Sequence, residues 1–179
     1  MGDGRYRTFW RRVGAALVDI VLFVPLTLLD EWVLSLQLPN ATMAAYLVVS
    51  SSIFLLYSIV MHGLCGQTVG KMLTRVRVLD LSEASITMPQ AILRDSPGLV
   101  FQLAFIPLAL IHLDWWIAFQ RGDLVDIPRW FLMLGFGAFL TALVEIATIL
   151  TNRKRRALHD FIAGSVVVKL YNHSMERAA

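Results

Sequence analysis

Two acidic side chains lie inside long apolar segments, where an ionised carboxylate is costly. Asp19 interrupts the apolar run at residues 13–29, and Glu145 interrupts the run at residues 130–152. A carboxylate at the centre of a membrane helix costs about 2.5–3.5 kcal/mol on insertion scales. A sequence that keeps such a residue either gives it a buried partner or uses it to bind a proton or a cation. For Asp19 both interpretations are open, an ion or proton site and a structural lock.

Arg12 precedes Asp19 by seven residues. Seven residues of α-helix turn about 700°, so the two side chains point to the same side of the helix. Residues 14–16 between them are Gly-Ala-Ala, and small residues allow a neighbouring helix to approach closely. The first apolar segment is therefore expected to present one face with a cation at its entry, a smooth middle and a buried acid.

The last apolar segment carries polar residues on one helical face. They follow i, i+4, i+7, i+11 spacing: Thr141, Glu145, Thr148 and Asn152. If this helix touches the first one, Glu145 and Asp19 lie at a similar depth and form a shared polar site, in which close acids share a proton or bind a cation. A simpler alternative is that the threonines bond to their own helix. Ser58 and His62 also share a face of the second apolar segment. We interpret the histidines His62, His112 and His173 as interfacial or surface residues rather than ligands.

Two other motifs invite an enzymatic interpretation that the residues do not support. His159 and Asp160 are adjacent, and adjacent residues on a helix point in different directions, so they do not form an acid–base pair with each other. Residues 66–71 resemble a phosphate-binding loop, but Cys65 replaces the first required glycine and Met72 the final Ser or Thr. We expect no enzymatic activity and no catalytic residue.

Composition places the chain in a membrane. Of its 179 residues, 57% are hydrophobic and 16% are charged, whereas a soluble domain is usually about 45–50% apolar and about 25% charged. This excludes a disordered chain. A helix needs about 20 apolar residues to cross a bilayer. We therefore predict an all-α membrane protein with transmembrane helices over about residues 10–34, 41–62, 96–118 and 129–152, four in number.

The Lys and Arg residues predict the orientation of these helices. The N-terminus has four, the second connection four and the C-terminal segment six of the 16 basic residues, whereas the first connection has none and the third has two. Basic residues favour the cytoplasmic side. We expect a multi-pass protein of the cell membrane with both termini in the cytoplasm.

The connections predict a single domain over residues 1–179, with a long cytoplasmic loop at 63–95 and a cytoplasmic C-terminal segment at 153–179. Residues 75–80 alternate between polar and apolar, and residues 164–169 are rich in valine. Both patterns are typical of strands. We expect these two strands to pair as a small cytoplasmic β element. A short helix is expected near residues 88–95.

The sequence gives no sign of a cofactor or a metal centre. Cys65 is the one cysteine, and together with His62 it supplies too few ligands for a metal site. The basic residues flank the apolar segments, so attraction to anionic lipid explains the sequence pI of about 9.4 without a nucleic-acid partner.

Three motifs together resemble the RDD family of small membrane proteins, named for one arginine and two aspartates. The first is residues 12–19, an arginine seven residues before an aspartate. The second is residues 66–71 followed by 75–78, with Arg94 further along, and the third is residues 156–160 followed by 163–165. On this resemblance Arg12, Asp19 and Asp160 are the name-giving residues. Further candidates outside these three are Glu145, Arg94, His159, Thr141 and Thr148.

The resemblance implies a role in transport, including cation/proton exchange, or in other members a role as a non-enzymatic membrane adaptor or assembly factor. We expect an exchanger that uses the buried Asp19, with the adaptor as the alternative. Four helices are few for a transport path, so for an exchanger we expect a homodimer in the lipid bilayer. An adaptor predicts a membrane-protein partner.

Overall fold

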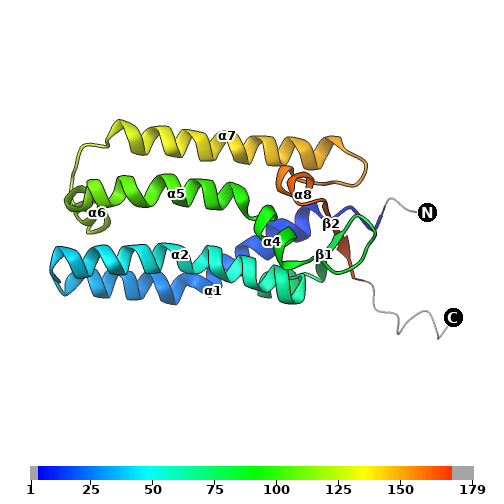
Figure 1. Cartoon of the computed structure of the whole chain (residues 1–179), viewed down its shortest axis with the longest axis horizontal. Helices are drawn as coiled ribbons and strands as arrows, with labels where there is room; N and C mark the ends of the chain where they lie inside the picture. The colour runs from blue at the N-terminus through cyan, green and yellow to red at the C-terminus, as the bar shows by residue number, and fades with distance from the viewer. Residues whose placement is uncertain (1–3, 171–179) are drawn as a thin grey trace.

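The structure, a computed structural model, describes residues 4–170. Its long helices run roughly along the longest axis of the molecule (Figure 1): α1 (Phe9–Ser35), α2 (Asn40–Cys65), α5 (Ser96–Ile111) and α7 (Arg129–Thr151). The shorter elements are α3 (Val69–Leu73), β1 (Val76–Asp80), α4 (Met88–Arg94), α6 (Leu113–Gln120), α8 (Leu158–Ile162) and β2 (Ser165–Lys169). Figure 1 shows β1, β2 and α8 beside both ends of the described chain, which we call the sheet end, and α6 at the opposite end, which we call the α6 end.

The long helices have the length and hydropathy of membrane spans. Within the described residues α1, α2 and α7 qualify individually, and α4 with α5 qualifies as one pair bent by 60°. This confirms a mainly helical protein with three to four candidate spans. The third span differs from the expected 96–118, because α5 ends at Ile111. The backbone of His112 (φ −111°, ψ 39°) departs from helical values and turns the chain into α6.

The predicted strand pair is confirmed. β1 and β2 are antiparallel, with Val78 opposite Val167. The valines of both strands are at most 1% exposed, because one face of the sheet packs on Ile86 and Ala91 and the other contacts Tyr6. The sheet end therefore contains the best-buried apolar core of the protein, and this core fixes the positions of the charged residues around it.

The glycine-rich stretch after the second span is more helical than expected. α2 continues to Cys65 and ends at Gly66, whose φ of +67° lies in the left-handed region. The Gly66 N–H donates to the carbonyl of His62 (2.9 Å), as a helix-terminating glycine commonly does. The reversal brings α3 back against the spans, so Thr68 and Gly70 are buried against α1 instead of lying in an open loop.

Candidate functional site

Asp160 is the centre of a charged cluster at the sheet end. Asp160 lies on α8 and is completely buried, and guanidinium groups from two other helices contact its carboxylate. Arg12 on α1 donates from Nη1 to Oδ2 (2.7 Å), and Arg94 on α4 donates from Nη1 to Oδ1. The backbone N–H of Ala157 also donates to Oδ2 (2.9 Å). Arg94 donates to the Ser165 hydroxyl as well (3.0 Å), and we call Arg12, Arg94, His159, Asp160 and Ser165 the Asp160 cluster.

The charged groups of this cluster form ion pairs with one another. Burial alone would raise the pKa of the Asp160 carboxyl, but the positive charges of Arg94 and Arg12 outweigh it and hold that pKa well below its usual value. The carboxylate thus stays ionised at neutral pH and ties α1, α4 and α8 together. Removing one member would leave a buried charge without its partner, which is strongly destabilising.

His159 extends the cluster towards Glu145 on α7. The Arg94 Nη2 group donates to His159 Nε2 (2.9 Å), so the ring proton of the neutral imidazole lies on Nδ1, which faces Glu145 Oε1 at 2.9 Å. Burial lowers the pKa of the His159 ring, and the charge of Arg94 lowers it further. Glu145 Oε1 also accepts from the His159 backbone N–H (3.2 Å). Glu145 is therefore the contact that fastens α7 to α8.

Asp19 has neutral donors as its partners. Its carboxylate accepts hydrogen bonds from the Thr68 hydroxyl (2.6 Å), the Gly70 N–H (2.8 Å) and the Tyr57 hydroxyl (2.9 Å). The Thr68 hydroxyl also accepts from the Lys71 N–H at the start of α3 (3.3 Å). Asp19 is 5% exposed, and these bonds hold α3 against α1 and α2. Of the two interpretations left open by the sequence, this geometry favours the structural lock.

Gly70 allows the close approach on which these bonds depend. A Cβ atom built on Gly70 would lie 2.0 Å from the Ala15 carbonyl oxygen and 2.9 Å from Asp19 Cγ. Ala15 is 1% exposed beneath it. The expected close approach to the small residues of the first span is therefore made by α3, the short helix after Gly66.

A second group of titratable side chains lies between α2, α3 and the α4–α5 junction. His62 is 2% exposed, so its interpretation as an interfacial or surface residue is wrong. Its Nε2 atom lies 2.7 Å from Lys71 Nζ, and its Nδ1 atom lies 3.3 Å from Asp95 Oδ2. Ser58 donates to Asp95 Oδ1 (3.0 Å). We call Ser58, His62, Lys71 and Asp95 the Lys71 cluster.

The Lys71 cluster forms a directed hydrogen-bonded chain. Because the Lys71 amine donates to Nε2, the ring proton of neutral His62 lies on Nδ1 and faces Asp95. Burial lowers the pKa of the Lys71 ammonium to about 7, and the charge of Arg94 adds to this effect. An amine that titrates near neutral pH, bonded through an imidazole to a carboxylate, can take up and release a proton.

The remaining predicted site residues have separate, local partners. Thr141 donates to the Gly137 carbonyl (2.9 Å), and Thr148 donates to the Val144 and Glu145 carbonyls (2.9 Å each). These are bonds within α7, as the simpler alternative predicted. Asp19 and Glu145 also have different partners, so these hydrogen bonds do not form the shared two-acid site expected from their similar depth. His173 lies outside the described residues.

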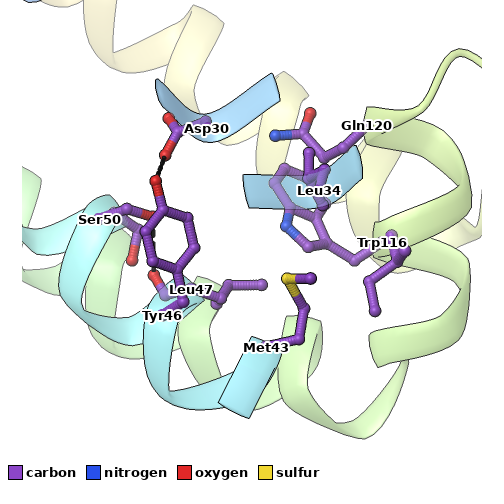
Figure 2. Close-up of a pocket in the computed structure, with 10 residues that line it drawn as sticks. Asp30, Leu34, Met43, Tyr46, Leu47, Ser50, Trp116 and Gln120 are labelled. Carbon is purple, nitrogen blue, oxygen red and sulfur yellow. Dashed lines mark hydrogen bonds between the residues drawn. The ribbon is translucent and has the colours of Figure 1, made fainter. Parts of the chain in front are cut away.

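A cavity of about 150 Å³ opens near the α6 end, between α1, α2 and α6. Figure 2 shows Asp30 and Tyr46 on one side of it, with Leu34 and Trp116 on the other and Met43 below. The Tyr46 hydroxyl donates to Asp30 Oδ1 (2.6 Å). No sequence pattern indicated this cavity, since its lining comes from three helices. Across residues 4–170 no group of three or more His, Cys, Asp or Glu side chains is placed to hold a metal ion.

Comparison with known proteins decides the family. The model of the RDD family matches residues 6–164, a stretch that holds Arg12, Asp19 and Asp160. The chain belongs to the RDD family. It is also 30% identical over 162 residues to the uncharacterized protein YckC of Bacillus subtilis (strain 168), covering 89% of this chain and 82% of that protein. No solved structure matches this RDD protein.

The name-giving residues suggested by the resemblance fall into two places in this RDD protein. Arg12 and Asp160 meet directly, although 148 positions separate them. Asp19 binds the segment at residues 68–70, which the sequence had already marked as part of the family's second motif. The first motif therefore contacts both of the others, because Arg12 joins α1 to α8 and Asp19 joins α1 to the α3 segment. The Lys71 cluster was missed, because only His62 and Ser58 share an element.

Proposed function

We propose that this RDD protein is a non-enzymatic membrane transporter that exchanges a cation for a proton, with the Lys71 cluster as the proton site. Polar side chains between α2 and α5 carry this proposal. They begin at Ser51, which lines the cavity and accepts from Gln102 Nε2 (2.9 Å), and resume at Ser58, which donates to Asp95. The gap from Ser51 to Ser58 is about 10 Å along the helix. Polar groups thus lie at both ends of the path from the cavity to Lys71, with the interval between Ser51 and Ser58 as the interruption.

The proton step needs only groups of the Lys71 cluster. The Lys71 ammonium gives one proton to His62 Nε2, and the ring passes its Nδ1 proton to the Asp95 carboxylate, so the total number of protons in the cluster is unchanged. The reverse sequence returns the proton to Lys71. Polar and ionisable groups at membrane depth are costly and commonly mark such proton relays. In this assignment Asp19 holds α3, and with it Lys71, in position.

In the proposed orientation both termini lie on the cytoplasmic side of a cell membrane, because 14 of the 16 Lys and Arg residues flank the spans on that side. The sheet end and the Lys71 cluster then face the cytoplasm. The cavity at the α6 end faces outward. A cation that enters from outside and a proton that binds near the cytoplasm would be handled at opposite ends of the same row of polar residues.

Proteoliposomes loaded with a pH-sensitive dye test this proposal. Addition of Na⁺, K⁺, Li⁺ or an organic ammonium to vesicles with an imposed pH gradient should change the internal pH when the wild-type protein is present. Lys71→Gln should abolish this change, because glutamine keeps a hydrogen-bonding side chain but carries no proton. Lys154→Gln is the matched control, since Lys154 is exposed and makes the same change of charge.

A histidine pair gives a second comparison. His62→Gln should also abolish the cation-dependent pH change, whereas His112→Gln should leave it intact, because His112 stacks on Trp130 away from the Lys71 cluster. A wild-type protein that produces no cation-dependent pH change, or a folded Lys71→Gln protein that matches wild type, would overturn the proposal.

α7 favours the alternative function of a membrane adaptor or assembly factor. Only 6% of the residues in an apolar 18-residue stretch of α7 are buried inside the protein. Nothing lies within 4 Å of a Cβ built on Gly135 or Gly137. Small residues on an uncovered membrane helix permit close packing of another helix, from a second copy or a partner membrane protein. For an adaptor, affinity purification should return one dominant partner that Gly137→Leu loses. Recovery of the protein alone would count against it.

A further inference from the structure

The cavity at the α6 end has an acid that is only partly satisfied. Asp30 Oδ1 accepts from the Tyr46 hydroxyl, but Oδ2 receives no hydrogen bond within residues 4–170. Asp30 is half-buried, and it forms no ion pair among the described residues. None of the ten residues that line the cavity is Lys or Arg. The carboxylate therefore offers an unbalanced negative charge to whatever enters.

The surroundings of Asp30 strengthen this charge. Five acids lie at the α6 end, in the last turns of α1, in α6 and in the connection to α7, and they are Asp30, Glu31, Asp114, Asp123 and Asp126. Two arginines lie there as well, Arg121 and Arg129. The guanidinium of Arg121 donates from Nη2 to the Leu34 carbonyl (3.1 Å), so its partner within the described residues is a backbone oxygen and not one of these acids. A cleft lined by one sign of charge raises the local concentration of ions of the opposite sign. The α6 end thus attracts cations.

Most of the remaining lining is aromatic or apolar, and its neutral polar members are Ser50, Ser51 and Gln120. Figure 2 shows the Tyr46 ring and the Trp116 indole facing each other across the opening, with Met43 below them. Trp116 is held from behind by Phe105, whose ring centroid lies 5.0 Å away in an edge-on arrangement. Aromatic faces attract cations and favour weakly hydrated ones such as alkylammonium groups. A bare alkali ion would instead need a shell of oxygen ligands.

We propose that this cavity binds a small organic ammonium ion, with Asp30 as its counter-ion and Tyr46 and Trp116 as its aromatic walls. The volume of about 150 Å³ sets the size of the ligand. A cavity of this volume holds a molecule of about the size of benzene. A quaternary ammonium with five heavy atoms fits this limit. The inference rests on the proposed function for its role, because it names the class of cation exchanged, but binding is measurable without transport.

Equilibrium dialysis of radiolabelled tetramethylammonium against the purified full-length protein tests the inference. Wild type should bind it saturably at one site per chain, and tert-butanol, a neutral molecule of the same size, should not compete. Asp30→Asn should weaken binding at least about tenfold, the equivalent of about 1.4 kcal/mol. Trp116→Leu should weaken it about fivefold. Glu83→Gln is the matched control and should change affinity less than about twofold, because Glu83 accepts from the Tyr6 hydroxyl at the sheet end and does not line this cavity.

Four results would overturn the inference. They are the absence of saturable binding to wild type, unchanged affinity in folded Asp30→Asn protein, equal competition by tert-butanol, and displacement by Na⁺ at concentrations equal to those of tetramethylammonium. Size-exclusion elution and melting temperature establish that each variant is folded. Saturable binding without a pH-coupled flux would refute the exchanger while leaving the cavity assignment intact, and a pH-coupled flux without binding would do the reverse.

Discussion

Replacing Gly70 with alanine would separate α3 from α1. The added Cβ would lie 2.0 Å from the Ala15 carbonyl oxygen, a backbone atom that cannot rotate away. α3 would have to move, and the Gly70 N–H would lose its 2.8 Å bond to Asp19 Oδ1. A hydrogen bond to a charged group contributes about 1.5–3 kcal/mol, and overpacking costs about 1–3 kcal/mol. The higher helix propensity of alanine returns about 1 kcal/mol.

The net loss for Gly70→Ala is therefore about 1.5–5 kcal/mol. For a protein of this size, 1 kcal/mol shifts the melting temperature by about 2–4 °C, so a decrease of roughly 3–20 °C is expected. The assay is the thermal unfolding of detergent-solubilised protein, followed by the fraction that still elutes as a monodisperse peak. Gly135→Ala on α7 is the control and should not lower the melting temperature, because nothing lies within 4 Å of its added Cβ. A Gly70→Ala protein that melts within about 1 °C of wild type would refute this account of the α1–α3 contact.

Other predictions concern the charged clusters and α7. Asp160→Asn leaves the buried Arg94 and the partly buried Arg12 without their shared partner, so unfolding should become easier by about 3–5 kcal/mol, measured by melting temperature. Because the folded-state pKa of Asp160 is depressed, its stabilisation is present above the unfolded value of about 3.9 and is lost as pH falls below that value. Melting temperatures from about pH 5 to pH 2 should show this loss in wild type and a weaker one in Asp160→Asn. Lys71 titrates at about 7 when folded and at about 10.4 when unfolded, so the unfolded chain binds more protons between these values and stability should rise with pH from 7 to 10, a slope that Lys71→Gln should remove. The groups that act on Lys71 across this range are His62, Asp95, Arg94, Asp19 and Arg12. Thr141→Val and Thr148→Val should each change stability by less than about 0.5 kcal/mol, since both hydroxyls bond only to their own helix within the described residues, and a larger loss would indicate a tertiary role.

Local patterns predicted the elements of the fold well. Apolar runs located the long helices, and the β-branched segment at residues 164–169 with the alternating segment at 75–80 located both strands and their pairing. The third span was predicted as one helix to residue 118, whereas α5 ends at Ile111 and the backbone at His112 leaves the helix. Hydrophobic composition indicates that a segment lies in lipid, but it does not indicate where the helix bends.

The partners of the charged residues could be predicted only in part. Helical periodicity placed Arg12 and the buried Asp19 on one face of α1, but it could not show that Arg12 binds Asp160 while Asp19 binds the α3 segment. Those contacts depend on how distant elements pack. His62 was misjudged for the same reason, since Asp95 and Lys71 reach it through a bent helix pair and the reversal at Gly66.

The division of work between Asp19 and Lys71 is most directly tested by measuring stability and pH-coupled flux on the same two variants. Asp19→Asn should lower the melting temperature by roughly 4–10 °C, since a buried hydrogen-bonded carboxylate is lost, and the protein that remains folded should still couple cation movement to protons. Lys71→Gln should melt within about 2 °C of wild type at pH 7 and should lose the coupling. Loss of coupling in folded Asp19→Asn protein, together with full coupling in Lys71→Gln, would contradict the account and return the proton site to Asp19.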